Sequence, residues 1–271
     1  MQRVSNHRFT DSTWTEARYY GGTLNRQLPL YVVAHDTAGR TAAGTVAYLA
    51  DDPRGKVSYH AIIDRNGTVT QMVPLDRAAH HAGVSAHPDK PWLIGLNRCS
   101  IGIAFDNPGK LDQDGRAWFG HQYEAAVYAE RDDQYGKWLP YTAAQLDAFE
   151  DIVTALDRGY GIDGVFSHYQ VATPRGRKAD TNPTLDGFLR AMHHSVEDKA
   201  ADMPLSERAV VNAAGGLNLR GEPGRHGPII ETMPIWTGVN VEPPVLANKY
   251  VLVTTDAGQT GWCHSAYLQG I

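Results

Sequence analysis

Two histidines and one aspartate follow predicted buried strands in this chain and could together bind a metal ion. His35 ends the apolar run of residues 31–34, His168 ends the run of residues 165–167, and Asp180 lies in the loop that comes next. Two imidazoles and one carboxylate with an open fourth position are typical ligands of a catalytic zinc ion. The spacing alone is equally compatible with two buried, hydrogen-bonded histidines and an aspartate that caps a loop.

Short β-rich runs and three helices are expected to position these residues. Asn66-Gly67 between two β-rich runs predicts a hairpin. The capping box of Thr142 and Gln145, followed by an apolar stripe at helical spacing, predicts a helix that packs in the core. The predicted strands are 31–34, 57–63, 68–73, 100–105 and 165–167, and the predicted helices are 42–49, 142–158 and 183–192.

Two long stretches of the chain show no sustained periodic pattern. Residues 74–98 contain histidines together with Pro and Gly breakers, and a loop of this length inside a compact domain usually has a function. Residues 110–140 predict an irregular insertion with a short helix near residues 123–131.

The composition argues against several classes of protein. With 25 Lys and Arg against 30 Asp and Glu the net charge is −5, which is unlike the basic excess of nucleic-acid-binding proteins. No apolar run approaches the ~18 residues of a membrane-spanning helix, and the first residues lack the apolar core of a secretion signal. Cys99 and Cys263 are far apart and are expected to be free thiols.

The last quarter of the chain differs in character from the rest. Charged residues 196–208 interrupt the apolar pattern, and short β-rich runs broken by Gly and Pro follow. This spacing favours a small all-β barrel. We therefore expect a first domain over residues 1–200, a linker over 201–208 and a second domain over 209–271.

Several stretches follow one another in a recognisable order. They are V-V-A-H-D-T at 32–37, V-S-Y-H-A-I-I-D-R-N-G-T-V at 57–69, R-A-A-H-H-A-G at 77–83, S-I-G-I at 100–103 and S-H-Y-Q-V-A-T-P-R-G-R-K-A-D at 167–180. In this order they resemble motifs of the zinc-dependent N-acetylmuramoyl-L-alanine amidases, a family that includes phage amidases and peptidoglycan-recognition proteins. The resemblance runs from about residue 30 to 195. It implies an α/β amidase domain with a central mixed β-sheet flanked by helices, and one Zn2+ per chain bound by His35, His168 and Asp180.

The resemblance also implies roles for residues around the metal. Lys178 matches the lysine that stabilises the developing oxyanion, and Tyr59 matches a tyrosine beside the metal-bound water. His81 matches a histidine expected to contact substrate, whereas His80 occupies a position that is tryptophan in the family motif. The remaining candidate substrate-binding residues are His60, Asn107 and Arg177.

Two features depart from the family pattern. Many bacterial members have a glutamate after S-I-G-I that acts as general base, and Ala104 stands there in this chain. Tyr59 and Lys178 are therefore expected to carry more of the chemistry, with Asp36 and Asp106 as the nearest acidic alternatives. The separation of His168 and Asp180 is also longer than in many members, which predicts a bulge in the loop before Asp180.

The second domain has a resemblance of its own. L-N-L-R-G-E-P-G at 217–224 resembles the opening of bacterial SH3 domains, and G-W-C-H-S-A-Y-L at 261–268 resembles their closing strand. Such domains commonly bind cell-wall peptides. A barrel that only stabilises the chain is the alternative.

Together these resemblances predict a zinc hydrolase that cleaves the amide bond between N-acetylmuramic acid and L-alanine in peptidoglycan. Its expected partner is the bacterial cell wall, with no nucleic acid and no membrane insertion. Without a secretion signal, the protein would reach the cell wall in one of two ways. It would be a phage endolysin released through a holin, or a toxin delivered into the periplasm of another cell. The toxin would have an immunity protein as a further partner. A non-catalytic peptidoglycan-binding module and a cytoplasmic amidase that recycles muropeptides are the alternatives.

Overall fold

The described part of the chain forms two compact units. The computed structural model describes residues 2–25, 27–28, 30–54, 56–132, 134–198, 208–211, 216–223, 227–234, 236–242, 250–264 and 268–270. The first unit comprises Met1–Asn25, Tyr31–Val153 and Gly164–His193, and the second comprises Arg26–Leu30, Thr154–Asp163 and His194–Ile271. Most of the predicted linker lies outside the described residues. No helix among the described residues has the length and apolar character needed to cross a bilayer.

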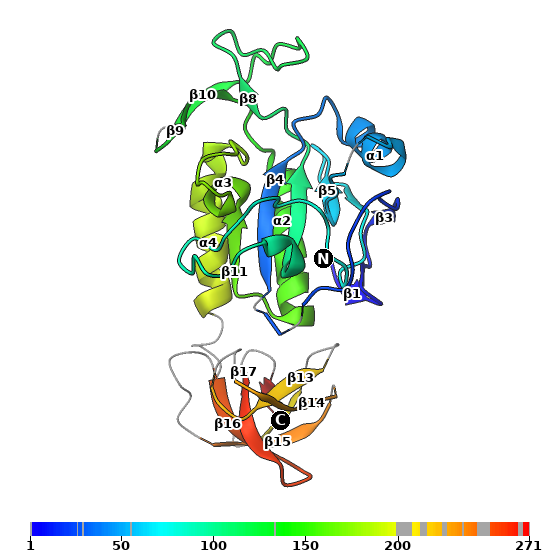
Figure 1. Ribbon diagram of the computed structural model, residues 1–271, viewed down its shortest axis with the longest axis vertical. Helices are drawn as coiled ribbons and strands as arrows, with labels where there is room; N and C mark the ends of the chain where they lie inside the picture. Colours follow the sequence, from blue (N-terminus) through cyan, green and yellow to red (C-terminus); the bar gives the residue numbers. More distant parts are fainter. Residues whose placement is uncertain are drawn as a thin grey trace. The chain divides into compact units, whose positions relative to one another are not determined.

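A six-stranded mixed sheet organises the first unit (Figure 1). Its central strands β4 and β7 are parallel, with His35 registered beside Ala104, and only the β5–β6 pair is antiparallel. The mixed sheet predicted for this part of the chain is therefore present. In spatial order the strands are β11 (Gly164–Ser167), β4 (Tyr31–Asp36), β7 (Ser100–Phe105), β5 (Ala61–Ile63), β6 (Val69–Gln71) and β3 (Thr13–Trp14).

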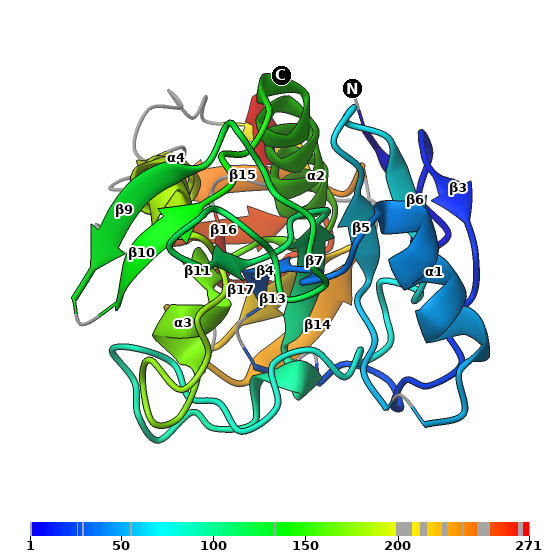
Figure 2. The same cartoon turned by 90° about the horizontal axis from the view of Figure 1, so that it is seen from above.

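Helices cover both faces of this sheet, which explains why every residue of β4 and β7 is buried. Neighbouring residues of a strand point to opposite faces. Ala104 packs in a cluster with residues of α1 (Ala42–Asp51), whereas the ring of Phe105 lies 5.1 Å from that of Phe149 on α2 (Ala143–Tyr160). Figure 2 shows α1 and α2 on different sides of the strands.

The local signals for helix ends are confirmed. Thr41 Oγ1 accepts a hydrogen bond from Gly44 N at the start of α1. Thr142 Oγ1 accepts from Gln145 N at 3.1 Å and Gln145 Oε1 accepts from Thr142 N, so the predicted capping box opens α2. The remaining helical segments are η1 (Leu96–Arg98), α3 (His168–Val171), η2 (Pro183–Leu185) and α4 (Asp186–Asp198). The strand predicted over 57–63 begins only at Ala61.

The short helix predicted near residues 123–131 is wrong. Residues Val127–Arg131 form β9, which pairs in register with β10 (Gln134–Trp138), and β10 also pairs with β8 (Lys110–Leu111). Asp132 follows β9 at the hairpin end with φ +48°. Pairing with β10 satisfies the main-chain hydrogen-bonding groups of β9, whose sequence has no strong periodic pattern of its own. A second small hairpin, β1 (Val4–Ser5) with β2 (Arg8–Phe9), lies in the N-terminal stretch.

The second unit contains a seven-stranded antiparallel sheet, which confirms an all-β C-terminal part. Its core includes Leu219, Val239, Val251, Val253 and the free thiol of Cys263. In spatial order its strands are β14 (Ile229–Met233), β13 (Leu217–Arg220), β17 (Thr260–His264), β16 (Tyr250–Thr255), β15 (Gly238–Glu242), β12 (Arg208–Val211) and β18 (Leu268–Gly270). The more specific SH3-like assignment stays a prediction.

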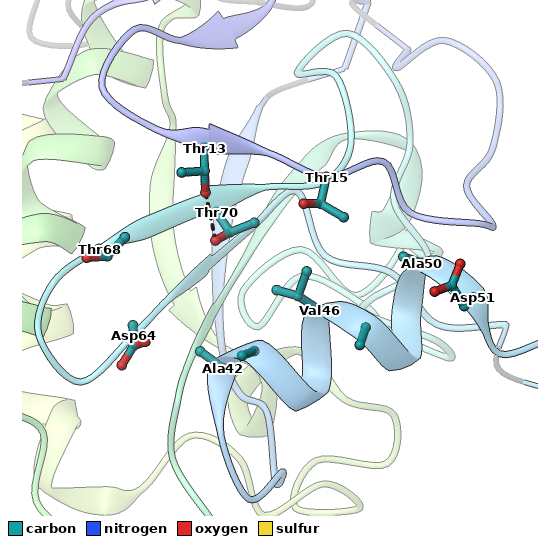
Figure 3. Close-up of a pocket in the computed structure, with 11 residues that line it drawn as sticks. Thr13, Thr15, Ala42, Val46, Ala50, Asp51, Asp64, Thr68 and Thr70 are labelled. Atoms are coloured by element: carbon teal, nitrogen blue, oxygen red, sulfur yellow. Dashed lines mark hydrogen bonds between the residues drawn. The ribbon is translucent and has the colours of Figure 1, made fainter.

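A pocket lies where α1 meets the edge strand β3 and its neighbour β6 (Figure 3). Its lining includes Thr13 and Thr70, whose hydroxyl oxygens are 3.0 Å apart, together with Val46 and Asp64. None of the residues with a predicted catalytic, binding or metal role lines it.

Candidate metal and catalytic site

The three predicted metal ligands converge on one point in the first unit. Asp180 Oδ2 lies 3.2 Å from His35 Nδ1 and 3.0 Å from His168 Nδ1. One ligand atom from each residue lies within 4.8 Å of the other two. Both histidines are buried, and the side chain of Asp180 is 21% exposed. This arrangement brings together residues separated by more than 140 positions.

The protonation of the three groups suits a divalent cation. Burial is the main cause that lowers the pKa of His35 to about 4, and the adjacent His168 contributes less. The imidazole of His35 is therefore neutral near pH 7. The carboxylate of Asp180 lies within hydrogen-bond distance of the Nδ1 atoms of both rings. His168 Nε2 lies 3.2 Å from the carbonyl oxygen of Ala82 and donates to it, which leaves the Nδ1 lone pair facing Asp180. Two nitrogen lone pairs and a carboxylate oxygen around one point fit a metal ion.

Each ligand is fixed by the element that carries it. His35 lies near the end of the fully buried strand β4, and β11 pairs beside β4 and leads directly into His168 at the start of α3. Ser167 caps α3 in a capping box with Gln170. The carbonyl of Asp180 accepts from Tyr169 N at 2.6 Å, so the loop that carries the third ligand is tied to the helix that carries the second.

The insertion over residues 110–140 braces the same region. Arg131 at the end of β9 forms a bidentate ion pair with Asp186 and donates from Nη2 to the carbonyl of Thr181 at 3.0 Å. Its guanidinium also lies 4.5 Å from the ring centre of Tyr169. Arg131 therefore contacts the neighbours of both Asp180 and His168. No sequence motif indicates this role of Arg131, because the contact spans 50 residues and the sequence does not predict β9.

The two predicted catalytic residues lie near the cluster. The ring of Tyr59 is 5.1 Å from that of His35. Burial, with smaller contributions from the charges of Asp180 and Asp36, raises the pKa of Tyr59, so its hydroxyl stays protonated near neutral pH. Lys178 is exposed. It lies two positions before Asp180 in the loop that carries the third candidate ligand.

The four predicted substrate-binding residues differ in how their polar atoms are used. His60 is fully buried, accepts from Gly102 N at Nδ1 and donates from Nε2 to the carbonyl of Arg77. Asn107 is fully buried, donates to the carbonyl of Leu139 and accepts from Gly109 N. These contacts use polar atoms of both side chains inside the protein, and their binding role stays a prediction.

The other two candidate substrate-binding residues, Arg177 and His81, differ from each other in exposure. Arg177 is exposed and donates to the carbonyls of Thr173 and Val84, at 3.0 Å each, so it links two surface loops. His81 is only 5% exposed and lies behind His35, with its Nδ1 2.9 Å from His35 Nε2. The predicted binding role of Arg177 stays a prediction.

No carboxylate occupies the place of the family's general base. Ala104 lies beside His35 in the sheet and shares its face, so a glutamate there would reach the ligand side. Asp36 points into the core, where Tyr141 donates to Oδ1 at 2.6 Å and Asn182 N to Oδ2 at 3.0 Å. Burial raises the pKa of Asp36 to about 8 despite these hydrogen bonds. Asp106 is 8% exposed, and burial likewise raises its pKa.

Comparisons with known proteins agree with this geometry. A curated AmpD of Escherichia coli K12, named 1,6-anhydro-N-acetylmuramyl-L-alanine amidase, is 29% identical over 142 residues, which are 51% of this chain and 59% of that protein. The Citrobacter freundii protein of the same name is 39% identical over 67 residues, 24% of this chain and 33% of that protein. The chain thus matches less than two thirds of the length of either relative.

Solved structures resemble the fold. A crystal structure of a Se-Met AmpD derivative superposes with a TM-score of 0.50 at 21% identity and covers 71% of this chain and 98% of that one. The model of the family described as N-acetylmuramoyl-L-alanine amidase matches residues 25–183, more than half of the chain and all three candidate ligands. The chain therefore belongs to the N-acetylmuramoyl-L-alanine amidase family.

Proposed function

We propose that this chain is a zinc-dependent amidase that cleaves the bond between N-acetylmuramic acid and L-alanine in peptidoglycan or its fragments. The convergence of His35 Nδ1, His168 Nδ1 and Asp180 Oδ2 in a member of this family is the observation that carries the proposal. These residues would hold one Zn2+. Bound zinc supplies Lewis-acid chemistry that polarises an amide carbonyl and makes water a stronger acid.

The neighbouring side chains supply the rest of the chemistry. The exposed ammonium of Lys178 stabilises the negative charge that develops on the carbonyl oxygen when water adds to it. Tyr59 keeps its proton because its pKa is raised, so its hydroxyl can orient the attacking water by a hydrogen bond. The imidazole of His35 stays available as a ligand near neutral pH, because burial lowers its pKa to about 4.

Metal content and amide cleavage measured on the same samples test this proposal. The purified chain should contain about one zinc per molecule and release L-alanine-bearing peptides from muropeptides. Asp180→Ala should lose both properties. Asp114→Ala removes an exposed carboxylate from the insertion and serves as the matched control, which should keep both. A fully active, zinc-loaded Asp180→Ala protein would place the third ligand elsewhere, and a metal-free, inactive wild type would favour a non-catalytic binding module.

The size of the substrate separates two versions of the proposal. An SH3-like C-terminal β-domain would bind polymeric wall, which fits an endolysin or a delivered toxin acting outside the cytoplasm, the latter with an immunity protein. The printed name of the curated relatives, 1,6-anhydro-N-acetylmuramyl-L-alanine amidase, favours recycling of small muropeptides. Cleavage rates on purified sacculi and on soluble anhydromuropeptides, measured side by side, distinguish the two. Faster turnover of the soluble fragment by the full chain would favour recycling.

A further inference from the structure

A line of hydrogen-bonding groups leads from His35 into the interior of the first unit. His35 Nε2 lies 2.9 Å from His81 Nδ1. On the far side of its ring, His81 Nε2 lies 3.1 Å from Ser100 Oγ and 3.4 Å from the carbonyl oxygen of Ser100. Ser100 Oγ in turn donates to the carbonyl of Leu96 at 2.7 Å. All three side chains of this line are 5% exposed or less.

The direction of each hydrogen bond in this line follows from counting protons. A serine hydroxyl has one hydrogen, and that of Ser100 is used on Leu96, so Ser100 Oγ must accept from His81. The carbonyl of Ser100 can only accept as well. The proton of a neutral His81 ring is therefore on Nε2, and its Nδ1 is an acceptor. His35 must then donate from Nε2, which leaves the lone pair of His35 on Nδ1, the atom that faces Asp180.

Packing holds the His81 ring in this orientation. Gly102 lies directly against it, and a Cβ at that position would come within 2.4 Å of the ring Cγ. Asn97 Oδ1 accepts from the main-chain nitrogens of His81 and Ala82, at 3.2 and 2.7 Å.

We propose that His81 and Ser100 set the tautomer and the ring orientation of His35, so that Nδ1 is presented to a divalent cation. His81 is then a positioning residue for the metal ligand, in place of the substrate contact expected for it from the sequence. His168 obtains the same tautomer from a simpler partner, the carbonyl of Ala82. The inference rests on the metal site of the proposed function and is independent of which bond the enzyme cleaves.

The expected effect of removing this support is on metal binding. Groups that hydrogen bond to a metal-ligating histidine typically change metal affinity by about 10–100-fold when they are removed. His81→Leu removes the acceptor for His35 Nε2. His81→Asn keeps it, because the asparagine Oδ1 can occupy the place of the imidazole Nδ1. Ser100→Ala leaves only the carbonyl oxygen as acceptor for His81 and should have an intermediate effect.

The experiment combines zinc affinity with direct observation of the tautomer. Zinc dissociation constants are measured by chelator competition for wild type, His81→Leu, His81→Asn and Ser100→Ala. His87→Leu is the matched control, because His87 is 6% exposed and contacts Tyr31 and Phe166 rather than a candidate ligand. Long-range proton–nitrogen NMR spectra of histidine-labelled wild type, without and with zinc, show which ring nitrogen of His35 and His81 carries the proton.

We expect zinc to bind about 10–100-fold more weakly to His81→Leu, with His81→Asn and His87→Leu close to wild type. The spectra should show both His35 and His81 protonated at Nε2. A proton on Nδ1 of His35 in the zinc-free protein, or wild-type zinc affinity in a folded His81→Leu protein, would overturn the inference. If His81→Leu does not fold, the wild-type spectra and His81→Asn still decide it. Tight zinc binding with the expected tautomers but no amidase activity would instead reject the proposed function alone.

Discussion

Replacing Arg131 by methionine should test whether the insertion holds the metal site in place. The side chain of Arg131 is 7% exposed, and its guanidinium forms three kinds of contact: the bidentate ion pair with Asp186, the hydrogen bond to the carbonyl of Thr181 and the stacking on Tyr169. Methionine has a similar length but provides none of the charge or the donors.

The expected loss of stability follows from what Arg131→Met leaves behind. Breaking a buried ion pair by removing one partner costs about 3–5 kcal/mol, because the other charge stays buried without compensation. Asp186 is 25% exposed and is the first residue of α4, where water and the helix dipole both stabilise a carboxylate. We therefore expect a loss nearer about 2–3 kcal/mol in the free energy of unfolding. Without Arg131, the loop that carries Asp180 is held less firmly, so zinc should bind about tenfold more weakly.

Urea unfolding followed by circular dichroism, and zinc competition on the same samples, measure both effects. Arg208→Met is the matched control, since its ion pair with Asp256 is about half exposed on both sides and should contribute less than about 1 kcal/mol. Arg131→Lys keeps the charge without the planar fork and should fall in between. Equal stability and equal zinc affinity for Arg131→Met and Arg208→Met would refute the bracing role of the insertion.

Three further outcomes can be checked. Lys178→Ala should lower the turnover rate roughly 10²–10³-fold, and Tyr59→Phe should lower it as well. Both variants should keep their zinc. Near-normal rates for both would make Asp36 or Asp106 the next candidates for the general base. Truncation at residue 203 should leave a chain that cleaves soluble muropeptides but binds sacculi less well in a pelleting assay. Unchanged binding would mean that the C-terminal β-domain is purely structural. Burial lowers the pKa of His60 to about 4 in the folded protein. As the pH falls below about 6.5, His60 therefore becomes protonated in the unfolded chain but not in the folded one. Unfolding free energy should therefore drop by about 2 kcal/mol between pH 7.5 and pH 5 on account of His60, and a His60→Gln protein with the same pH slope would contradict this.

The sequence alone was sufficient for the elements whose signals are local. The hairpin at Asn66-Gly67, the capping box of Thr142 and Gln145 and the all-β character of the C-terminal part each depend on residues a few positions apart, and each is present. The ligand trio was also predictable, because each member lies at or just after the end of a strand or in a motif that resembles a known family.

The tertiary structure decided what those residues do, because hydrogen-bond partners come from distant segments. The sequence makes His60, His81 and Asn107 candidates for substrate binding. In the structure their polar atoms are used inside the protein by segments 17 to 46 residues away. The β9–β10 hairpin formed because pairing satisfied a main chain whose sequence specified no element. The order and spacing of the motifs predict which side chains come together. Only the packed sheet determines which ring nitrogen faces Asp180 and which faces the core, since that choice depends on acceptors such as Ser100 and Ala82 that no motif contains in that role.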